Sequence, residues 1–254
     1  MVIAGLYTVF VWWFSTGVIL YLNGMPRHTF KFTMTGATVV LIAALYALVI
    51  TSQITEVWAA YCAFTCAVLV WAWQEIGFLL GFVTGSRRQA CPEGATGWRR
   101  ARYAFQAVSH HELALVILGA AVWLATKDGE NQVGFYTFLI LWAMRQSAKL
   151  NVFLGVRNLN EDFLPPHLKY LQTYFTRRSM NALLPVSIVL STLVVIPLWQ
   201  AVFASATGGV DQIGMALLAM LLTLAIIEHF FLVLPLPFEA LWKWGLRSRT
   251  AHHS

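Results

Sequence analysis

The sequence has few charged residues and very few acidic ones. Only 11 of its 254 residues are Asp or Glu, and charged residues of both signs make up 11% of the chain, against about 25% in ordinary soluble domains. Hydrophobic residues make up 59%, and the mean hydropathy is +0.67. This composition excludes a water-soluble globular domain and predicts an integral membrane protein.

Cysteine is also scarce. Cys62 and Cys66 lie one helical turn apart in an apolar stretch, and Cys91 lies in a basic connection. This spacing predicts neither a disulfide framework nor a structural zinc site. Because no linker, repeat or low-complexity segment divides the chain, we expect a single helical membrane domain over residues 1–254, whose backbone satisfies its own hydrogen bonds in lipid.

Apolar stretches close to the roughly 20 residues that cross a bilayer occur repeatedly. They cover residues 2–23, 32–53, 57–84, 99–126, 132–155, 182–206 and 212–234. The first stretch follows no basic n-region and precedes no small-residue cleavage site, so we expect it to be retained. The sequence therefore predicts an all-α, polytopic membrane protein with about seven transmembrane helices.

Lys and Arg concentrate in every second connection. The basic connections are 24–31, 85–102, 156–181 and the C-terminal tail, whereas the other connections carry few positive charges or none. Positively charged connections tend to stay in the cytoplasm, which predicts an N-terminus outside and a C-terminus in the cytoplasm. Topology and contact with anionic membrane lipid account for the net charge of +6, so no nucleic-acid partner is expected.

Three glutamates, Glu75, Glu112 and Glu228, lie inside the apolar stretches. A carboxylate at mid-bilayer costs roughly 3 kcal/mol or more, so each needs a compensating interaction. Counted from the cytoplasmic ends of their helices, all three fall roughly 10–18 Å inside the apolar core, at about 1.5 Å per residue. Arg145 and Lys149, in the stretch 132–155, fall at the same level.

Three interpretations of this polar layer remain open. The carboxylates could pair with Arg145 and Lys149 and fix the register of the helices, or they could form a proton or ion path. They could also hold a metal or cofactor together with histidines, because Glu and His are ligands for iron, manganese and zinc. The candidate metal ligands are Glu75, His110, His111, Glu112, Glu228 and His229, and the candidate cofactor-binding residues are His111, His229, Arg145 and Lys149.

Helical geometry limits the metal interpretation. Successive residues turn by about 100°, so His110 and Glu112 point roughly 160° apart and cannot both be ligands of one ion. The set expected to face inward is Glu75, His111 and either Glu228 or His229. Such a set fits a mononuclear site, or a histidine that ligates the central metal of a tetrapyrrole, better than a di-iron centre, whose paired Glu-x-x-His motifs are absent.

Tryptophan is abundant, with 11 residues in the chain. Trp12 and Trp242 lie near the ends of expected spans, where interfacial aromatic belts occur, so we interpret them as membrane anchors. Trp71 and Trp73 lie close to Glu75. They either line a pigment or cofactor pocket or pack in the core.

The connection 156–181 is the longest one. After two prolines, apolar residues recur in it at helical spacing, at Leu164, Leu168, Leu171 and Phe175. This pattern predicts a short amphipathic helix on the cytoplasmic membrane surface. The segment is either a lid over the bundle or a docking surface for a partner.

The stretch SAKLNVFLGVRNLNEDFLPPHLKYLQTYF, together with SHHELALVILG and WQEIGF, resembles the PuhE family of photosynthetic complex assembly proteins of purple and related phototrophic bacteria. The resemblance covers nearly the whole chain and is most specific over 147–175. It implies a multi-pass protein of the bacterial cytoplasmic or intracytoplasmic membrane, with reaction-centre subunits, bacteriochlorophyll or its precursors as partners. It supplies no catalytic residues.

Two classes of function follow. The first is a non-catalytic assembly factor that holds reaction-centre subunits or supplies bacteriochlorophyll. The second is a membrane oxidoreductase that acts on a tetrapyrrole, isoprenoid or quinone through bound iron, manganese or zinc. The family context favours assembly, and the residues leave open whether the protein is an enzyme.

Overall fold

The computed structural model describes residues 1–159, 161–204 and 209–250. Within these residues the backbone is helical and forms no sheet, apart from one isolated bridge between Val156 and Arg177. The all-α prediction is confirmed. The long helices are α1 (Val2–Asn23), α2 (Phe30–Ser52), α3 (Val57–Leu79), α4 (Gly97–Thr126), α5 (Val133–Leu154), α6 (Leu183–Ala204) and α7 (Val210–Phe231).

Among the described residues, six of these helices are long and apolar enough to cross a membrane. The exception is α5, which has a comparable length but carries Arg145 and Lys149 in its second half. The chain is therefore a multi-pass membrane protein, while the seventh crossing and the orientation stay predictions. Residues 205–206, at the end of the predicted span 182–206, lie outside the described residues.

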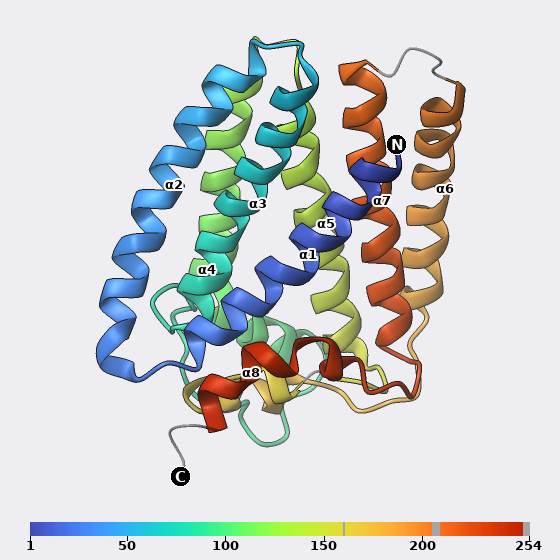
Figure 1. Ribbon diagram of the computed structural model, residues 1–254. Helices are drawn as coiled ribbons and strands as arrows, with labels where there is room; N and C mark the ends of the chain where they lie inside the picture. Colours follow the sequence, from blue (N-terminus) through green and yellow to red (C-terminus); the bar gives the residue numbers. More distant parts are fainter. Residues whose placement is uncertain (160, 205–208, 251–254) are drawn as a thin grey trace.

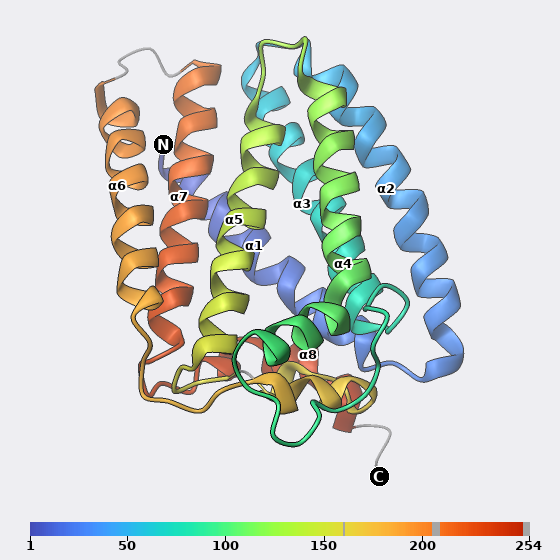
Figure 2. The ribbon, with the colours of Figure 1, turned by 180° about the vertical axis from the view of Figure 1, so that it is seen from behind.

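The long helices form one bundle (Figure 1). Helix α1 runs obliquely across one face of the bundle, α6 and α7 pair at one edge, and α5 lies between this pair and the group α2, α3 and α4 (Figures 1 and 2). Short elements gather at a single end, which also carries the basic connections. These elements are η1 (Arg27–Thr29), η2 (Glu161–Phe163), η3 (Pro166–Tyr174), η4 (Phe238–Trp242) and α8 (Lys243–Thr250).

Helices α3 and α7 form the interior of the bundle. In their apolar windows 72% and 61% of the residues are buried, compared with 17% in α2 and 11% in α6. The outer helices expose large apolar side chains such as Phe32, Ile42 and Leu193. Apolar side chains facing outward on long helices are what a lipid environment requires, so α2 and α6 form part of the lipid-facing surface.

Helix α3 is shorter than the predicted span 57–84, because it ends at Leu79. Gly81 follows with a positive φ of 85°, a conformation that glycine adopts without strain and that commonly ends helices. The His167 side chain donates from Nε2 to the Leu79 carbonyl over 2.9 Å. A contact from a distant segment therefore stabilises this end of the helix.

Helix α4 is bent near its middle. The backbone N–H of His111 donates to the carbonyl of Thr84 over 2.9 Å, and a Cβ on Gly85 would lie 2.2 Å from the Gln106 carbonyl oxygen. A helix kinks where an outside group bonds into its backbone ladder. Figure 2 shows the first turns of α4 running obliquely across the end of the bundle before the helix continues along it.

The connection 156–181 is helical where an amphipathic helix was predicted, but as the 3-10 helix η3. Leu168 and Leu171 are buried against Phe78 and Leu79 at the end of α3. The Arg100 guanidinium ties this segment to the bundle, because it donates to the Thr176 hydroxyl over 2.6 Å and to the carbonyl of Tyr174. The segment therefore covers the end of the bundle.

Candidate functional site

A cavity of about 680 Å³ lies among α1, α3, α4, α5 and α7, and residues of the connection 156–181 border it at the loop end. Its walls are largely apolar and rich in aromatic side chains, among them Phe64, Trp71, Phe78, Phe153, Phe175 and Trp242. This volume and lining are typical of sites for small molecules and cofactors.

The cavity is lined by most of the predicted site residues. They are Glu75, Glu112, Arg145, Lys149, Glu228 and His229. Four helices, α3, α4, α5 and α7, supply these side chains. The structure thus brings together residues that are up to 154 positions apart in the chain, as the estimate of their depth predicts.

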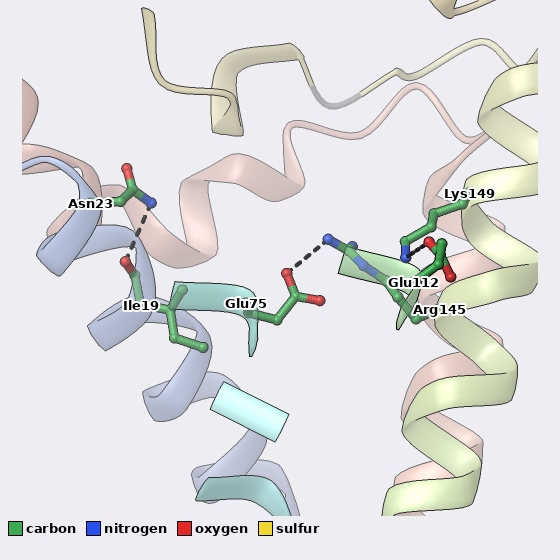
Figure 3. Close-up of polar contacts among 6 residues, drawn as sticks. All are labelled: Ile19, Asn23, Glu75, Glu112, Arg145 and Lys149. Atoms are coloured by element: carbon green, nitrogen blue, oxygen red, sulfur yellow. Dashed lines mark hydrogen bonds and ion pairs between the residues drawn. The ribbon is translucent and has the colours of Figure 1, made fainter. Parts of the chain in front are cut away.

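Glu75 is neutralised by Arg145. Arg145 Nη2 lies 3.0 Å from Glu75 Oε2, and Figure 3 shows the guanidinium reaching from α5 toward the α3 carboxylate. The Glu75 side chain is only 9% exposed, whereas 43% of the Arg145 side chain is accessible. The remaining guanidinium surface borders the cavity, so Arg145 can bind a ligand acceptor without releasing Glu75.

Glu112 is neutralised by Lys149. The Lys149 Nζ lies 2.7 Å from Glu112 Oε1, and the Gln146 amide donates to Glu112 Oε2. Both donors lie on α5, about one turn apart, so a single helix holds both carboxylate oxygens of its neighbour. Figure 3 places this pair beside the Glu75–Arg145 pair.

Glu228 differs from the other two glutamates because its described partner is neutral. Trp12 Nε1 donates to Glu228 Oε1 over 2.8 Å, and none of the ion pairs within the described residues includes Glu228. The side chain lines the cavity and is accessible there. With three carboxylates and two cations along its wall, the cavity keeps one carboxylate available to a ligand.

His229 is buried and held from both sides. Its Nδ1 lies 2.9 Å from the Ala225 carbonyl, which can only accept, so Nδ1 carries the proton. In the neutral ring, Nε2 then accepts from the Ser147 hydroxyl over 2.8 Å. To ligate a metal through Nε2, the ring would first have to release Ser147.

The other two candidate histidines do not line the cavity. His110 is exposed on the surface of α4, and its role as a metal ligand stays a prediction. His111 is 1% exposed and packs on Phe78 with ring centroids 4.6 Å apart. Its two ring nitrogens have no hydrogen-bond partner among the described residues. Phe78, on which the His111 ring packs, does line the cavity.

The six candidate metal ligands are not assembled as a ligand set. Among the described residues, no group of three or more His, Cys, Asp and Glu side chains is placed to hold a metal ion. The physical reason is that Glu75 and Glu112 are paired with cations of α5. The metal site stays a prediction, and the described geometry favours the ion-paired interpretation for these two carboxylates.

Two contributors to the site were missed by sequence reasoning. Trp12 is interpreted from sequence as a membrane anchor, but it bonds Glu228 and lines the cavity. Ser147 is uncharged and is not among the predicted site residues, yet its hydroxyl bonds and orients His229. Ser147 lies two residues from both Arg145 and Lys149, so it points away from them on the helix, and their charges give no signal for it. For Trp12 no sequence signal exists either, since α1 and α7 are 216 residues apart at this contact.

Comparison with known proteins places the chain in a family. The family model described as "Protein of unknown function (DUF3623)" matches residues 1–253. A relative from Rhodobacter capsulatus, named as an uncharacterized 30.4 kDa protein in the puhA 5' region, is 39% identical over 256 residues that cover 97% of this chain and 91% of the relative. No solved structure matches the chain.

Proposed function

We propose that this chain, which belongs to the DUF3623 family, is a membrane assembly factor of the bacterial photosynthetic apparatus that holds bacteriochlorophyll or one of its precursors. The observation that carries the proposal is the cavity of about 680 Å³. It combines apolar, aromatic walls with a few fixed polar groups, which is what an amphipathic pigment with a flat ring and polar substituents requires.

The polar groups of the cavity suit a tetrapyrrole in two ways. Glu228 keeps a carboxyl oxygen that has no described partner, and such an oxygen can accept a pyrrole N–H or bind a central metal. Arg145 presents guanidinium surface to the same cavity, and a guanidinium binds the carboxylate or carbonyl substituents of the macrocycle. The aromatic walls exclude water around the ring.

The relatives support the photosynthetic setting. The gene of the Rhodobacter capsulatus relative lies in the puhA 5' region of a phototrophic bacterium, and the stretch 147–175 resembles the PuhE assembly family. On the strength of this setting we propose the cytoplasmic or intracytoplasmic membrane as the location of the protein, with reaction-centre subunits as candidate recipients of the pigment. The oxidoreductase alternative requires a metal centre, for which no ligand group is assembled among the described residues.

The topology that we propose has seven crossings, with the N-terminus outside and the C-terminus in the cytoplasm. In this topology helix α5 is the seventh crossing, which is supported by the position of Arg145 and Lys149 in the cavity lining. Cys91, in the basic connection between α3 and α4, reports the orientation. A membrane-impermeant maleimide is expected to label it in inverted vesicles but not in intact cells, and Cys91→Ser is the control. Labelling of intact cells would reverse the topology.

The pigment proposal is tested by purifying the protein from a phototrophic host and recording its absorption spectrum and metal content. We expect the absorption bands of a tetrapyrrole, with an intensity that corresponds to about one pigment per chain. Ala148 lines the cavity on α5, and Ala148→Trp is expected to fill part of it and remove the bound pigment.

Ala143→Trp is the matched control, because Ala143 lies on the same helix but is exposed and outside the cavity lining. It should retain the pigment. Colourless wild-type protein would contradict the proposal, as would equal pigment content in the two variants. Colourless protein with stoichiometric iron, manganese or zinc would instead favour the oxidoreductase.

A further inference from the structure

A second, smaller pocket lies at the loop end of the bundle. It has a volume of about 290 Å³ and shares no lining residue with the larger cavity. Three segments meet there: η1 with the start of α2, the end of α3 with the loop after it, and η3. These segments lie at the end of the bundle that carries the basic connections (Figure 1).

The charges that line this pocket are all positive. Arg27 comes from η1 and Arg88 from the loop after α3, and no Asp or Glu lines the pocket. Arginines elsewhere at this end have structural partners: Arg87 donates to the Tyr174 hydroxyl over 2.9 Å, and Arg177 pairs with Glu161. Within the described residues, no ion pair includes Arg27 or Arg88. Their charge therefore remains available to an anion.

Two buried hydroxyls complete the polar lining. The hydroxyls of Thr84 and Tyr170 border the pocket and lie close to each other, but neither has a partner at normal hydrogen-bond geometry among the described residues. Burial raises the pKa of Tyr170 above its ordinary value. The phenol therefore stays protonated at neutral pH and can donate a hydrogen bond to an anionic oxygen.

Gly81 and His167, which line the pocket, are held in place by packing and hydrogen bonding. Gly81 has a φ of 85°, and a Cβ at this position would lie 3.2 Å from the His167 ring. His167 is itself held by its bond to the Leu79 carbonyl. Because these lining groups are already ordered, binding a ligand costs little conformational entropy.

We propose that this pocket binds a phosphate group, through Arg27 and Arg88 as cations and the Tyr170 and Thr84 hydroxyls as hydrogen-bond donors. Arginine binds phosphate oxygens in a bidentate manner, and basic pockets at the cytoplasmic ends of transmembrane helices bind anionic lipid headgroups. A lipid headgroup and a soluble phosphate present the same chemistry. Phe30, Leu80 and Leu168 add apolar surface suited to the glycerol and the first methylenes of a lipid.

The test uses the full-length protein, delipidated in an uncharged detergent. Apparent affinity is measured by native mass spectrometry and by the shift in Tm, with phosphatidylglycerol, with soluble glycerol phosphate and with phosphate-free diacylglycerol. We expect phosphatidylglycerol to bind and diacylglycerol not to bind. The double variant Arg27→Gln/Arg88→Gln should bind phosphatidylglycerol about tenfold more weakly or worse.

The matched control is Arg102→Gln/Lys243→Gln, which removes the same charge from exposed positions outside the pocket at the same end of the bundle. It should bind as the wild type does. Tyr170→Phe removes one hydroxyl while keeping the ring, so it tests the pocket even if the arginine variant folds poorly, and about tenfold weaker binding is expected.

Competition by glycerol phosphate would identify a soluble phosphate as the ligand, and binding of phosphatidylglycerol alone would identify a lipid headgroup. Equal losses in the two charge variants, or unchanged binding in Tyr170→Phe, would overturn the proposal. The larger cavity is not altered by these variants, so pigment content measured on the same samples separates this inference from the proposed function.

Discussion

The two ends of the bundle differ in how their helices meet. At the end remote from the basic connections, side chains of one helix pack directly on glycines of another: a Cβ on Gly134 of α5 would lie 2.4 Å from the Leu48 side chain of α2, and one on Gly214 of α7 would lie 2.6 Å from the Val133 side chain of α5. Toward the other end, α5 and α7 border a cavity of about 680 Å³ together with α1, α3 and α4. Glycines at crossings of membrane helices allow this close approach.

The difference indicates a division of roles along one set of helices. The closely packed end fixes the positions of α2, α3, α5 and α7 through dispersion contacts, for which tight packing is required. Around the cavity, two ion pairs join the helices, Glu75–Arg145 and Glu112–Lys149. A bundle that is rigid at one end can keep a cavity at the other.

The largest effect on stability is expected from Gly129→Ala at the closely packed end. A Cβ there would lie 2.3 Å from the backbone oxygen of Ser52, an oxygen that also accepts from the Asn131 N–H over 3.0 Å. Because a backbone atom cannot move aside, we expect a loss of about 2–3 kcal/mol. Thermal unfolding in detergent measures it.

Gly36→Ala is the control for that substitution. Gly36 lies in α2, and a Cβ there would meet nothing within 4 Å, so replacing a helical glycine should be neutral or stabilising by up to about 1 kcal/mol. If Gly129→Ala were as stable as Gly36→Ala, the two ends of the bundle would not differ in packing as described.

A smaller effect is expected from Arg145→Leu beside the cavity. The substitution leaves the Glu75 carboxylate, only 9% exposed, without its cation, and we expect a loss of about 2 kcal/mol because Arg145 is itself partly accessible. In a Glu75→Gln background the same change should cost much less. A double-mutant cycle on unfolding free energies measures this coupling, and additive losses would mean that the pair does not stabilise the fold.

The smallest effect on stability is expected from Glu228→Gln, at less than about 1 kcal/mol. An amide oxygen can accept the Trp12 N–H as the carboxylate does, and no described cation is left without a partner. Pigment content should nevertheless fall, since an amide NH2, which cannot accept a hydrogen bond or ligate a metal, replaces the second carboxyl oxygen. A loss of stability equal to that of Arg145→Leu would show that Glu228 has a structural role like that of Glu75.

Local sequence patterns were sufficient for the helices but not for the contacts between them. Apolar runs and their charged flanks predict where α1 and α5 begin and end to within a residue, because each helix satisfies its own backbone in lipid. They also place three glutamates at one level. They do not predict that Arg145 and Lys149 pair with Glu75 and Glu112, because pairing depends on how helices are rotated against each other.

The early end of α3 shows the same limit. The apolar run continues to residue 84, but the chain leaves the helix at Leu79 because a histidine 88 positions later bonds that carbonyl. Gly81 and Gly85 were the local sequence features that could have indicated the end of the helix. The reason for glycine at these positions is that a Cβ would contact His167 or the α4 backbone, which only the fold shows. Distant contacts thus decide what an apolar run alone cannot.

The bend of α4 connects the two pockets through one backbone hydrogen bond. Thr84 lines the smaller pocket, while Val108 and Glu112 line the cavity, and the bond from the His111 N–H to the Thr84 carbonyl joins them. If the loop after α3 moves away from α4, this hydrogen bond breaks and no longer holds the bend of α4. Hydrogen exchange at the His111 amide therefore reports how often the loop and the helix separate.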